Sequence, residues 1–198
     1  IKYKRSMLRV ILIAMTLTMS IVIVGAQEVK VNFDDLEEAL LSPDDVEILI
    51  LKREKYNEWP NELAMFRNLR VLDLSHNKIE SLPKNLSALA NLEELDLTGN
   101  NLDSLQSSIG DLLSLKKLML GNNEIYHVTE RIGDLEYLTN LELWSNNIYY
   151  LPSRISNLEH LNEIDLRGIQ MNEVHQHTIK ALFGPSVKIR LSISCNCD

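Results

Sequence analysis

The chain has 198 residues, of which 24% are charged, and a formal net charge of −8 at neutral pH. It lacks the lysine and arginine clusters that hold nucleic acids and anionic membranes, so we expect neither as a partner. Two cysteines, Cys195 and Cys197, are too few for a disulfide framework, and the length suits one domain with a substantial core.

The first 26 residues have the composition of an export signal. Arg9 precedes an apolar run that ends at Val24, and Val24 and Ala26 are small residues that suit signal peptidase. The apolar stretch of 17 residues over 10–26 also lies at the short edge of what spans a bilayer, roughly 17–25 residues, so a retained anchor stays open as the alternative. Loss of residues 1–26 removes four basic residues and no acidic one, which takes the formal charge to −12. We expect a secreted or cell-envelope protein that meets a membrane only through an uncleaved N-terminal segment.

Residues 27–45 predict a helical N-terminal cap. Phe33, Leu36 and Leu40 have helical spacing, Asn32 is the predicted N-cap residue, and Ser42 with the following proline predicts the helix end.

A repeat of 23 residues occupies residues 46–168. It is carried by Val46, Leu69, Leu92, Leu115, Leu138 and Leu161, with further apolar residues and an asparagine at constant offsets. Alternation predicts one short strand per unit, with Leu72 and Leu74 buried and Val71, Asp73 and Ser75 facing outward. Because one unit cannot bury its own leucines, neighbouring units must stack.

These units, of the form LxxLxLxxNxL, resemble the leucine-rich-repeat family, and four of them match fully. The resemblance implies an α/β solenoid, a right-handed curved coil with a parallel sheet on its concave side, a helical N-terminal cap and a mixed C-terminal cap. The segment LEEAL at residues 36–40 and the terminal CNC are also similar to small exported bacterial leucine-rich-repeat proteins.

The repeated asparagine has a predicted structural role. An amide side chain both donates and accepts, so a stacked column can satisfy backbone groups where the chain bends after each strand. The predicted ladder consists of Asn77, Asn100, Asn123 and Asn146.

Residues 169–198 predict the C-terminal cap. Val174, Ile179 and Leu182 suggest a helix that ends at Gly184, and the alternation over 187–193 suggests a final edge strand.

No phosphate-binding loop, dinucleotide motif or nucleophile elbow occurs, so we predict neither an enzyme nor a cofactor. The four residues of zinc-ligand type near the C-terminus are His175, His177, Cys195 and Cys197. Histidines two apart on a helix point to nearly opposite faces, so we predict no metal site. Surface histidines, and either two thiols or a local disulfide, remain the alternatives.

Two groups of outward residues are candidates for a binding surface on the concave face. An acidic column contains Asp73, Asp96, Met119, Glu142 and Asp165, and it either favours a basic partner or only keeps the sheet soluble. An aromatic group contains Trp144, Tyr126, His127, Tyr149 and Tyr150, and it either anchors a partner or shields core leucines.

The sequence therefore predicts a non-catalytic protein-binding module that acts outside the cytoplasm on a partner with basic and apolar groups. The alternatives are a structural or adhesive component of the cell envelope, and a carbohydrate-binding surface protein whose Trp144 and tyrosines stack on sugar rings.

Overall fold

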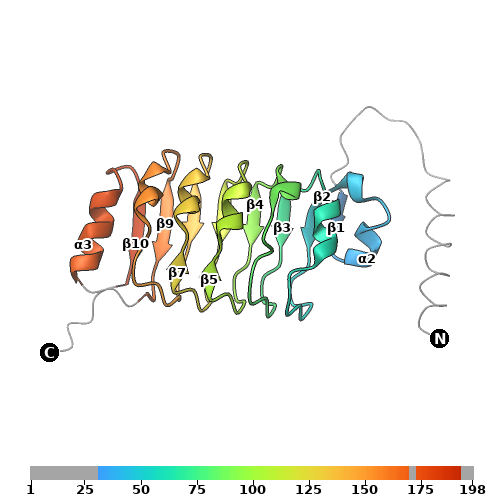
Figure 1. Ribbon diagram of the computed structural model, residues 1–198, viewed down its shortest axis with the longest axis horizontal. Helices are drawn as coiled ribbons and strands as arrows, with labels where there is room; N and C mark the ends of the chain where they lie inside the picture. The colour runs from blue at the N-terminus through green and yellow to red at the C-terminus, as the bar shows by residue number, and fades with distance from the viewer. Residues whose placement is uncertain (1–30, 170–172, 193–198) are drawn as a thin grey trace.

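The computed structural model describes residues 31–169 and 173–192. Their main element is one eight-stranded sheet in which every neighbouring pair is parallel, with the strands stacked in chain order along the molecule (Figure 1). The strands are β1 (Val31–Phe33), β2 (Val46–Ile50), β3 (Val71–Asp73), β4 (Glu94–Asp96), β6 (Lys117–Met119), β8 (Asn140–Glu142), β9 (Glu163–Leu166) and β10 (Lys188–Leu191). The export-like segment, Cys195 and Cys197 lie outside the described residues.

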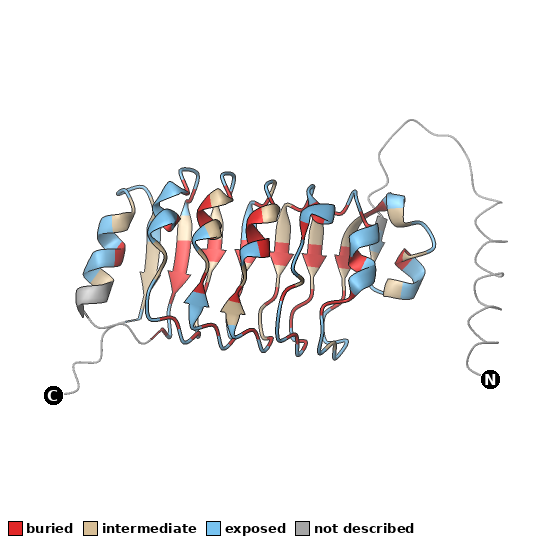
Figure 2. Ribbon diagram, viewed as in Figure 1, coloured by how far each residue is buried: buried red, intermediate tan, exposed pale blue. Residues whose placement is uncertain are grey.

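The constant repeat length sets the register of the sheet. From β3 to β9 each residue pairs with the residue 23 positions later, so the buried leucine of each strand stacks directly on the next. This stack contains Leu72, Leu95, Leu118, Leu141 and Ile164, none more than 1% exposed. Each such side chain contributes roughly 1.5–3 kcal/mol by its burial. The core is therefore a continuous ridge shared between coils, as the burial colours of Figure 2 show.

The return segment of each coil is short. It contains the 3₁₀ helices η2 (Asn61–Met65), η3 (Ser87–Leu89), η4 (Ser107–Asp111), η5 (Glu130–Asp134) and η6 (Ser153–Asn157). A 3₁₀ helix rises more per residue than an α-helix, which suits a return with few residues to spare. Two short strands, β5 (Ser104–Leu105) and β7 (His127–Val128), pair as a second parallel sheet. In Figure 1 these segments lie in front of the eight-stranded sheet.

The N-terminal segment corrects the predicted helix. Residues 31–33 form β1, which pairs with β2, and α2 (Leu36–Ala39) is only four residues long. Its N-cap residue is Asp35, whose side chain accepts a hydrogen bond from the Glu38 N–H at 2.9 Å, and not the predicted Asn32. The reason is that β1 supplies backbone partners to the edge of β2, which a helix in the same place would leave unpaired. The next element after α2 is the 3₁₀ helix η1 (Pro43–Asp45), which directly precedes β2.

The C-terminal segment contains α3 (Glu173–Leu182), followed by β10, which pairs in register with β9. Ile179 of α3 is buried, and Leu182 packs against the core while half-buried. No helix within 31–169 or 173–192 is long and apolar enough to cross a membrane.

Candidate partner-binding surface

The face of the eight-stranded sheet that points away from the core, here called the sheet face, is the face predicted to be concave. Ladder pairing places Asp73, Asp96, Met119, Glu142 and Asp165 side by side on it, one from each of five successive strands. We call this set the acidic column. Ile50 of β2 continues it toward the N-terminus.

The aspartates of the acidic column also hold the backbone where each strand ends. The Ser75 N–H donates to Oδ1 of Asp73 at 2.8 Å, and the Thr98 N–H donates to Oδ1 of Asp96 at 2.8 Å. A short acidic side chain that accepts from the residue two positions on stabilises a turn. Ser75, predicted to face outward, is only 5% exposed, because β3 has already ended at Asp73 and the chain is turning.

Asp165 has a different environment, because its charge is paired within the chain. Its side chain is 6% exposed, and Nη2 of Arg167 donates to its Oδ2 at 2.6 Å. Nε of Arg167 donates to Oδ1 at 2.9 Å, and the Arg167 backbone N–H donates to the same atom at 3.1 Å. Burial alone raises the pKa of Asp165, but these hydrogen bonds outweigh it and lower the pKa below its usual value. The same hydrogen bonds act in the opposite direction on Arg167 and raise its pKa. The negative charge of Asp165 is therefore already balanced by Arg167.

The repeated asparagines satisfy backbone groups inside the coil. Nδ2 of Asn100 donates to the carbonyls of Leu74 and Leu97, both at 3.0 Å, and its Oδ1 accepts from the Ile79 N–H at 3.0 Å. Asn123 and Asn146 make the equivalent bonds one and two coils further on. In Asn77, Oδ1 accepts from the Tyr56 N–H. These residues are buried and act within the fold.

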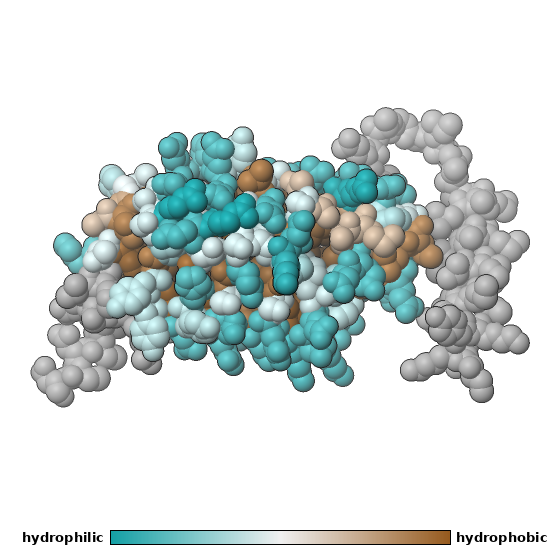
Figure 3. All heavy atoms as spheres, viewed as in Figure 1, coloured by the Kyte–Doolittle hydropathy of each residue, from teal (hydrophilic) through white to brown (hydrophobic). Residues whose placement is uncertain are grey.

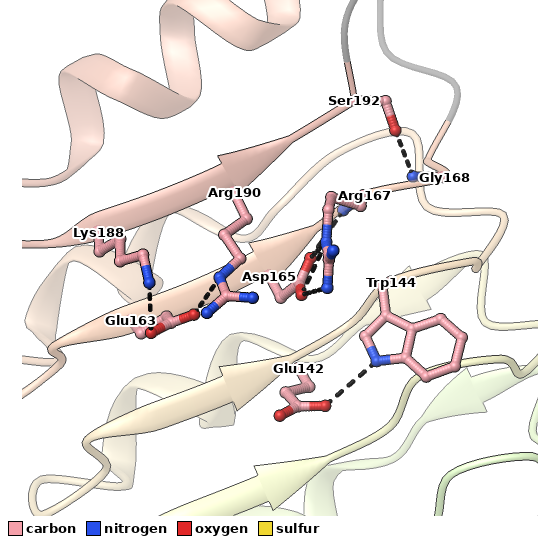
Figure 4. A network of polar contacts seen from close by, with 9 residues as sticks. All are labelled: Glu142, Trp144, Glu163, Asp165, Arg167, Gly168, Lys188, Arg190 and Ser192. Atoms are coloured by element: carbon pink, nitrogen blue, oxygen red, sulfur yellow. Dashed lines mark hydrogen bonds and ion pairs between the residues drawn. The ribbon is translucent and has the colours of Figure 1, made fainter.

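Trp144 is held in one orientation at the end of β8. A Cβ added to Gly121, the equivalent residue of the preceding coil, would lie 2.1 Å from Cε2 of Trp144, so the indole occupies the space of that missing side chain. The indole Nε1–H donates to Oε2 of Glu142 at 3.1 Å (Figure 4). Gly121 was not part of the predicted site. The signal for it was a glycine 23 residues before a tryptophan, at a position where earlier coils have Ser75 and Thr98.

The other aromatic residues do not join Trp144. His127 lies in β7 of the two-stranded sheet, so its predicted place on the concave sheet is wrong. The chain has passed the asparagine turn before it reaches this residue. Tyr126 precedes His127, and Tyr149 and Tyr150 occupy the same two positions one coil later. The tyrosines are 57%, 64% and 71% exposed respectively. They are exposed, lie after the asparagine turns of two successive coils, and belong to no strand of the eight-stranded sheet that carries the acidic column.

A shallow pocket of about 330 Å³ lies beside Trp144. It is lined by Trp144, Ser145, Arg167 and Gly168, where β8 and β9 end. We call it the Trp144 pocket. Its last three residues were not predicted from the sequence, and Arg167 takes the place that Trp144 has in the preceding coil.

A second depression of about 290 Å³ lies beyond the other ends of the strands. Its lining includes Arg70 and Glu93, which with Lys116 form a chain of ion pairs of 2.9 and 2.8 Å. The hydrogen bond from Lys116 is the largest of the effects that lower the pKa of Glu93. Charged groups on this border are thus already paired.

The residues of zinc-ligand type are not brought together by any described contact. His177 is exposed on α3, while the side chain of His175 and both cysteines lie outside what the structure describes. Over 31–169 and 173–192, no three His, Cys, Asp or Glu side chains are grouped as metal ligands.

Comparison with known proteins identifies the family. A model of the leucine-rich repeat region matches residues 48–182, so the chain belongs to the leucine-rich-repeat family, as the repeats predicted. This is a solenoid fold that suggests a protein–protein interaction module, and the family is generally not enzymatic. No curated protein matches the chain.

The solved structures similar to this chain include the following three. A leucine-rich-repeat protein of Leptospira interrogans is 28% identical with a TM-score of 0.64, over 82% of this chain and 48% of that one. The leucine-rich-repeat ectodomain of a plant membrane receptor kinase from Arabidopsis thaliana, in complex with Casparian strip integrity factor 2, is 32% identical with a TM-score of 0.56, over 64% and 16%. Internalin C2 from Listeria monocytogenes is 24% identical with a TM-score of 0.62, over 80% and 66%, and shows the fold alone. The chain spans about half the length of the Leptospira protein.

Proposed function

We propose that the chain is a non-catalytic module that binds a protein partner outside the cytoplasm through its sheet face. The observation that carries the proposal is the immobilised Trp144. An aromatic side chain already held by Gly121 and Glu142 loses little rotamer freedom when a partner covers it. Tryptophans in such positions are frequent anchors of interfaces.

The charge of the sheet face supports a partner with basic and apolar groups. Among the described residues, Asp73, Asp96 and Glu142 form no ion pair. By contrast, Glu94 and Glu163, two positions earlier on their strands than members of the acidic column, pair with Lys117 and Arg190 of the adjacent strands. Met119 adds an apolar side chain between Asp96 and Glu142. This excess of negative charge attracts basic groups and raises their rate of association.

A place outside the cytoplasm is supported by the export-like composition of residues 1–26 and by the extracellular location of a similar solved structure. The plant relative is an ectodomain, and it was solved with a bound partner. Within the proposal, residues 1–26 are the export segment, 27–45 the N-terminal cap, 46–168 the repeats and 169–198 the C-terminal cap.

The test is a pulldown from secreted and cell-surface fractions, followed by affinity measurement with the captured protein. Trp144→Ala is expected to weaken binding by at least tenfold, since truncation of an anchor typically costs about 2 kcal/mol or more. Tyr137→Ala is the matched control, because Tyr137 is also an exposed aromatic residue but stacks on His160 instead. Salt should weaken the wild-type complex if the acidic column contributes. Equal binding by wild type and Trp144→Ala would refute the proposal.

A further inference from the structure

We propose that the Trp144 pocket binds a neutral saccharide ring. The pocket combines an aromatic surface, a guanidinium group and a hydroxyl group within one depression of about 330 Å³. That volume lies at the lower end of the range of small-molecule sites, roughly 300–1,000 Å³, and suits one ring with its neighbours outside. This site goes beyond the proposed protein binding and does not depend on it.

Trp144 supplies the apolar part of the site. Its indole lies against the backbone of Gly121 in the preceding coil and borders the pocket made with Arg167 and Gly168 of the next coil. The hydrogen bond to Glu142 prevents the ring from rotating (Figure 4). A fixed, flat aromatic surface suits the C–H face of a sugar ring, which is similarly rigid and wide enough to cover an indole.

Arg167 supplies directed donors. Asp165 engages Nε and Nη2, which fixes the guanidinium plane. Nη1 makes no hydrogen bond to any residue within the described ranges, so its N–H groups remain available. The edge formed by Nη1 and Nη2 presents parallel donors, and two neighbouring hydroxyl oxygens of a sugar can accept from them.

Gly168 keeps the Ser145 hydroxyl accessible. A Cβ at Gly168 would lie 2.9 Å from Oγ of Ser145, so any larger residue there would crowd the hydroxyl. The Ser145 hydroxyl both donates and accepts, and the Glu142 carboxylate beside the indole accepts. The site therefore offers donors and acceptors close to one apolar surface.

The local charge decides which ligand class fits. Glu142, Asp165 and Arg167 carry a combined charge of −1, so a carboxylate or phosphate meets net repulsion despite the arginine. An ammonium group inside the pocket would meet Arg167, the charged residue of its lining, whereas the basic groups of a protein partner would meet Glu142 and the acidic column outside it. A hydroxyl group donates to one neighbour and accepts from another without bringing a charge, so a neutral polyhydroxyl ligand complements all the groups at once.

The experiment follows the two tryptophan indole N–H signals of the ¹⁵N-labelled full chain by NMR. Trp59 is buried and serves as internal reference, and the signal lost in Trp144→Phe assigns Trp144. The probes come from an array of immobilised glycans and include two matched pairs of soluble trimers. These are N-acetylglucosamine against glucosamine, which is cationic, and galactose against galacturonate, which is anionic.

We expect at least one neutral saccharide to shift the Trp144 signal saturably and to leave the Trp59 signal in place. Trp144→Ala lacks the reporter signal, so its binding is measured on the glycan array, where it is expected to be about tenfold weaker, the equivalent of about 1.4 kcal/mol. Arg167→Lys keeps the charge beside Asp165 but removes the planar donor edge, and it should weaken binding about fivefold even if Trp144→Ala folds poorly. Tyr137→Ala should bind as wild type does.

The proposal is overturned if no soluble neutral glycan shifts the Trp144 signal, if a charged trimer binds better than its neutral counterpart, or if Trp144→Ala and Arg167→Lys both bind normally. A protein partner that shifts the signal equally after enzymatic removal of its glycans, while no free saccharide does, would also overturn it. Loss of the shift on deglycosylation would identify a glycoprotein as the source of the sugar. Shifts by free oligosaccharides identify a polysaccharide-type ligand.

Discussion

Removal of the Asn100 amide should destabilise the fold far more than its size suggests. In Asn100→Ala, two hydrogen bonds to the carbonyls of Leu74 and Leu97 and one from the Ile79 N–H disappear, all of them 3.0 Å long and buried. Water does not reach these groups, so each stays wholly or partly unsatisfied. At about 1–1.5 kcal/mol for each bond, the expected loss of unfolding free energy is about 3–4.5 kcal/mol. That is a large fraction of the roughly 5–15 kcal/mol typical of a domain.

The measurement is urea unfolding followed by circular dichroism with linear extrapolation. Asn101→Ala is the control, because Asn101 is the exposed neighbour and its change should cost less than about 0.5 kcal/mol. In Asn100→Asp one oxygen can still accept from Ile79, but the donors are lost and a carboxylate faces two carbonyls. Its loss should therefore be at least as large at pH 7 and smaller in acid, where the protonated group regains a donor. A loss below 1 kcal/mol for Asn100→Ala, or equal losses at positions 100 and 101, would refute the reasoning.

Three further outcomes are expected. Gly121→Ala should displace the indole of Trp144, with a red shift of tryptophan emission and a stability loss of about 1–2 kcal/mol. In a Trp144→Ala background the same change should cost under about 0.5 kcal/mol. Equal costs of Gly121→Ala in the two backgrounds of this double-mutant cycle would contradict the packing described. The folded-state pKa of Asp165 is lowered, so the contribution of its carboxylate to the unfolding free energy is present above the unfolded pKa of about 3.9 and is lost as the pH falls through the folded pKa. Asp165→Asn should therefore lower the unfolding free energy by about 1–3 kcal/mol at pH 7 and by progressively less below about pH 4. A difference that does not change with pH would count against the pairing with Arg167. Glu93→Gln should change the unfolding free energy by less than about 1 kcal/mol despite its two ion-pair partners, because both of those partners are solvent-exposed, and a loss above 2 kcal/mol would contradict this.

The repeat predicted the sheet well because a constant unit length leaves little freedom of register. Once Leu72 and Leu95 occupy equivalent places, the residues on either side of each leucine must pair as β3 and β4 do. The end of the solenoid was harder to predict. Phe33 fits the spacing of a helix and also the end of a strand, and the choice depends on the unpaired edge of β2, which no local pattern reveals.

The candidate site was predicted only in part, because its contacts join different coils. Trp144 was found from its own position, but its support by Gly121 appears only when equivalent residues of adjacent units are compared. Asp165 and Arg167 are two residues apart, yet their pairing depends on side-chain orientation after the strand. His127 was assigned to the wrong sheet because the turn after the asparagine changes the direction of the chain within a few residues.

The contact between Trp144 and Gly121 also makes Trp144 an intrinsic reporter of bending in the solenoid. A solenoid flexes by changing the separation of neighbouring coils, each of which contacts little else. The indole of one coil lies on the backbone of the coil before it, so widening of that gap admits water to the indole, whereas Trp59 stays in the core at the N-terminal end. The emission of Trp144 therefore reports flexing at this single joint, and any ligand that straightens or tightens the solenoid there can be followed without an added label.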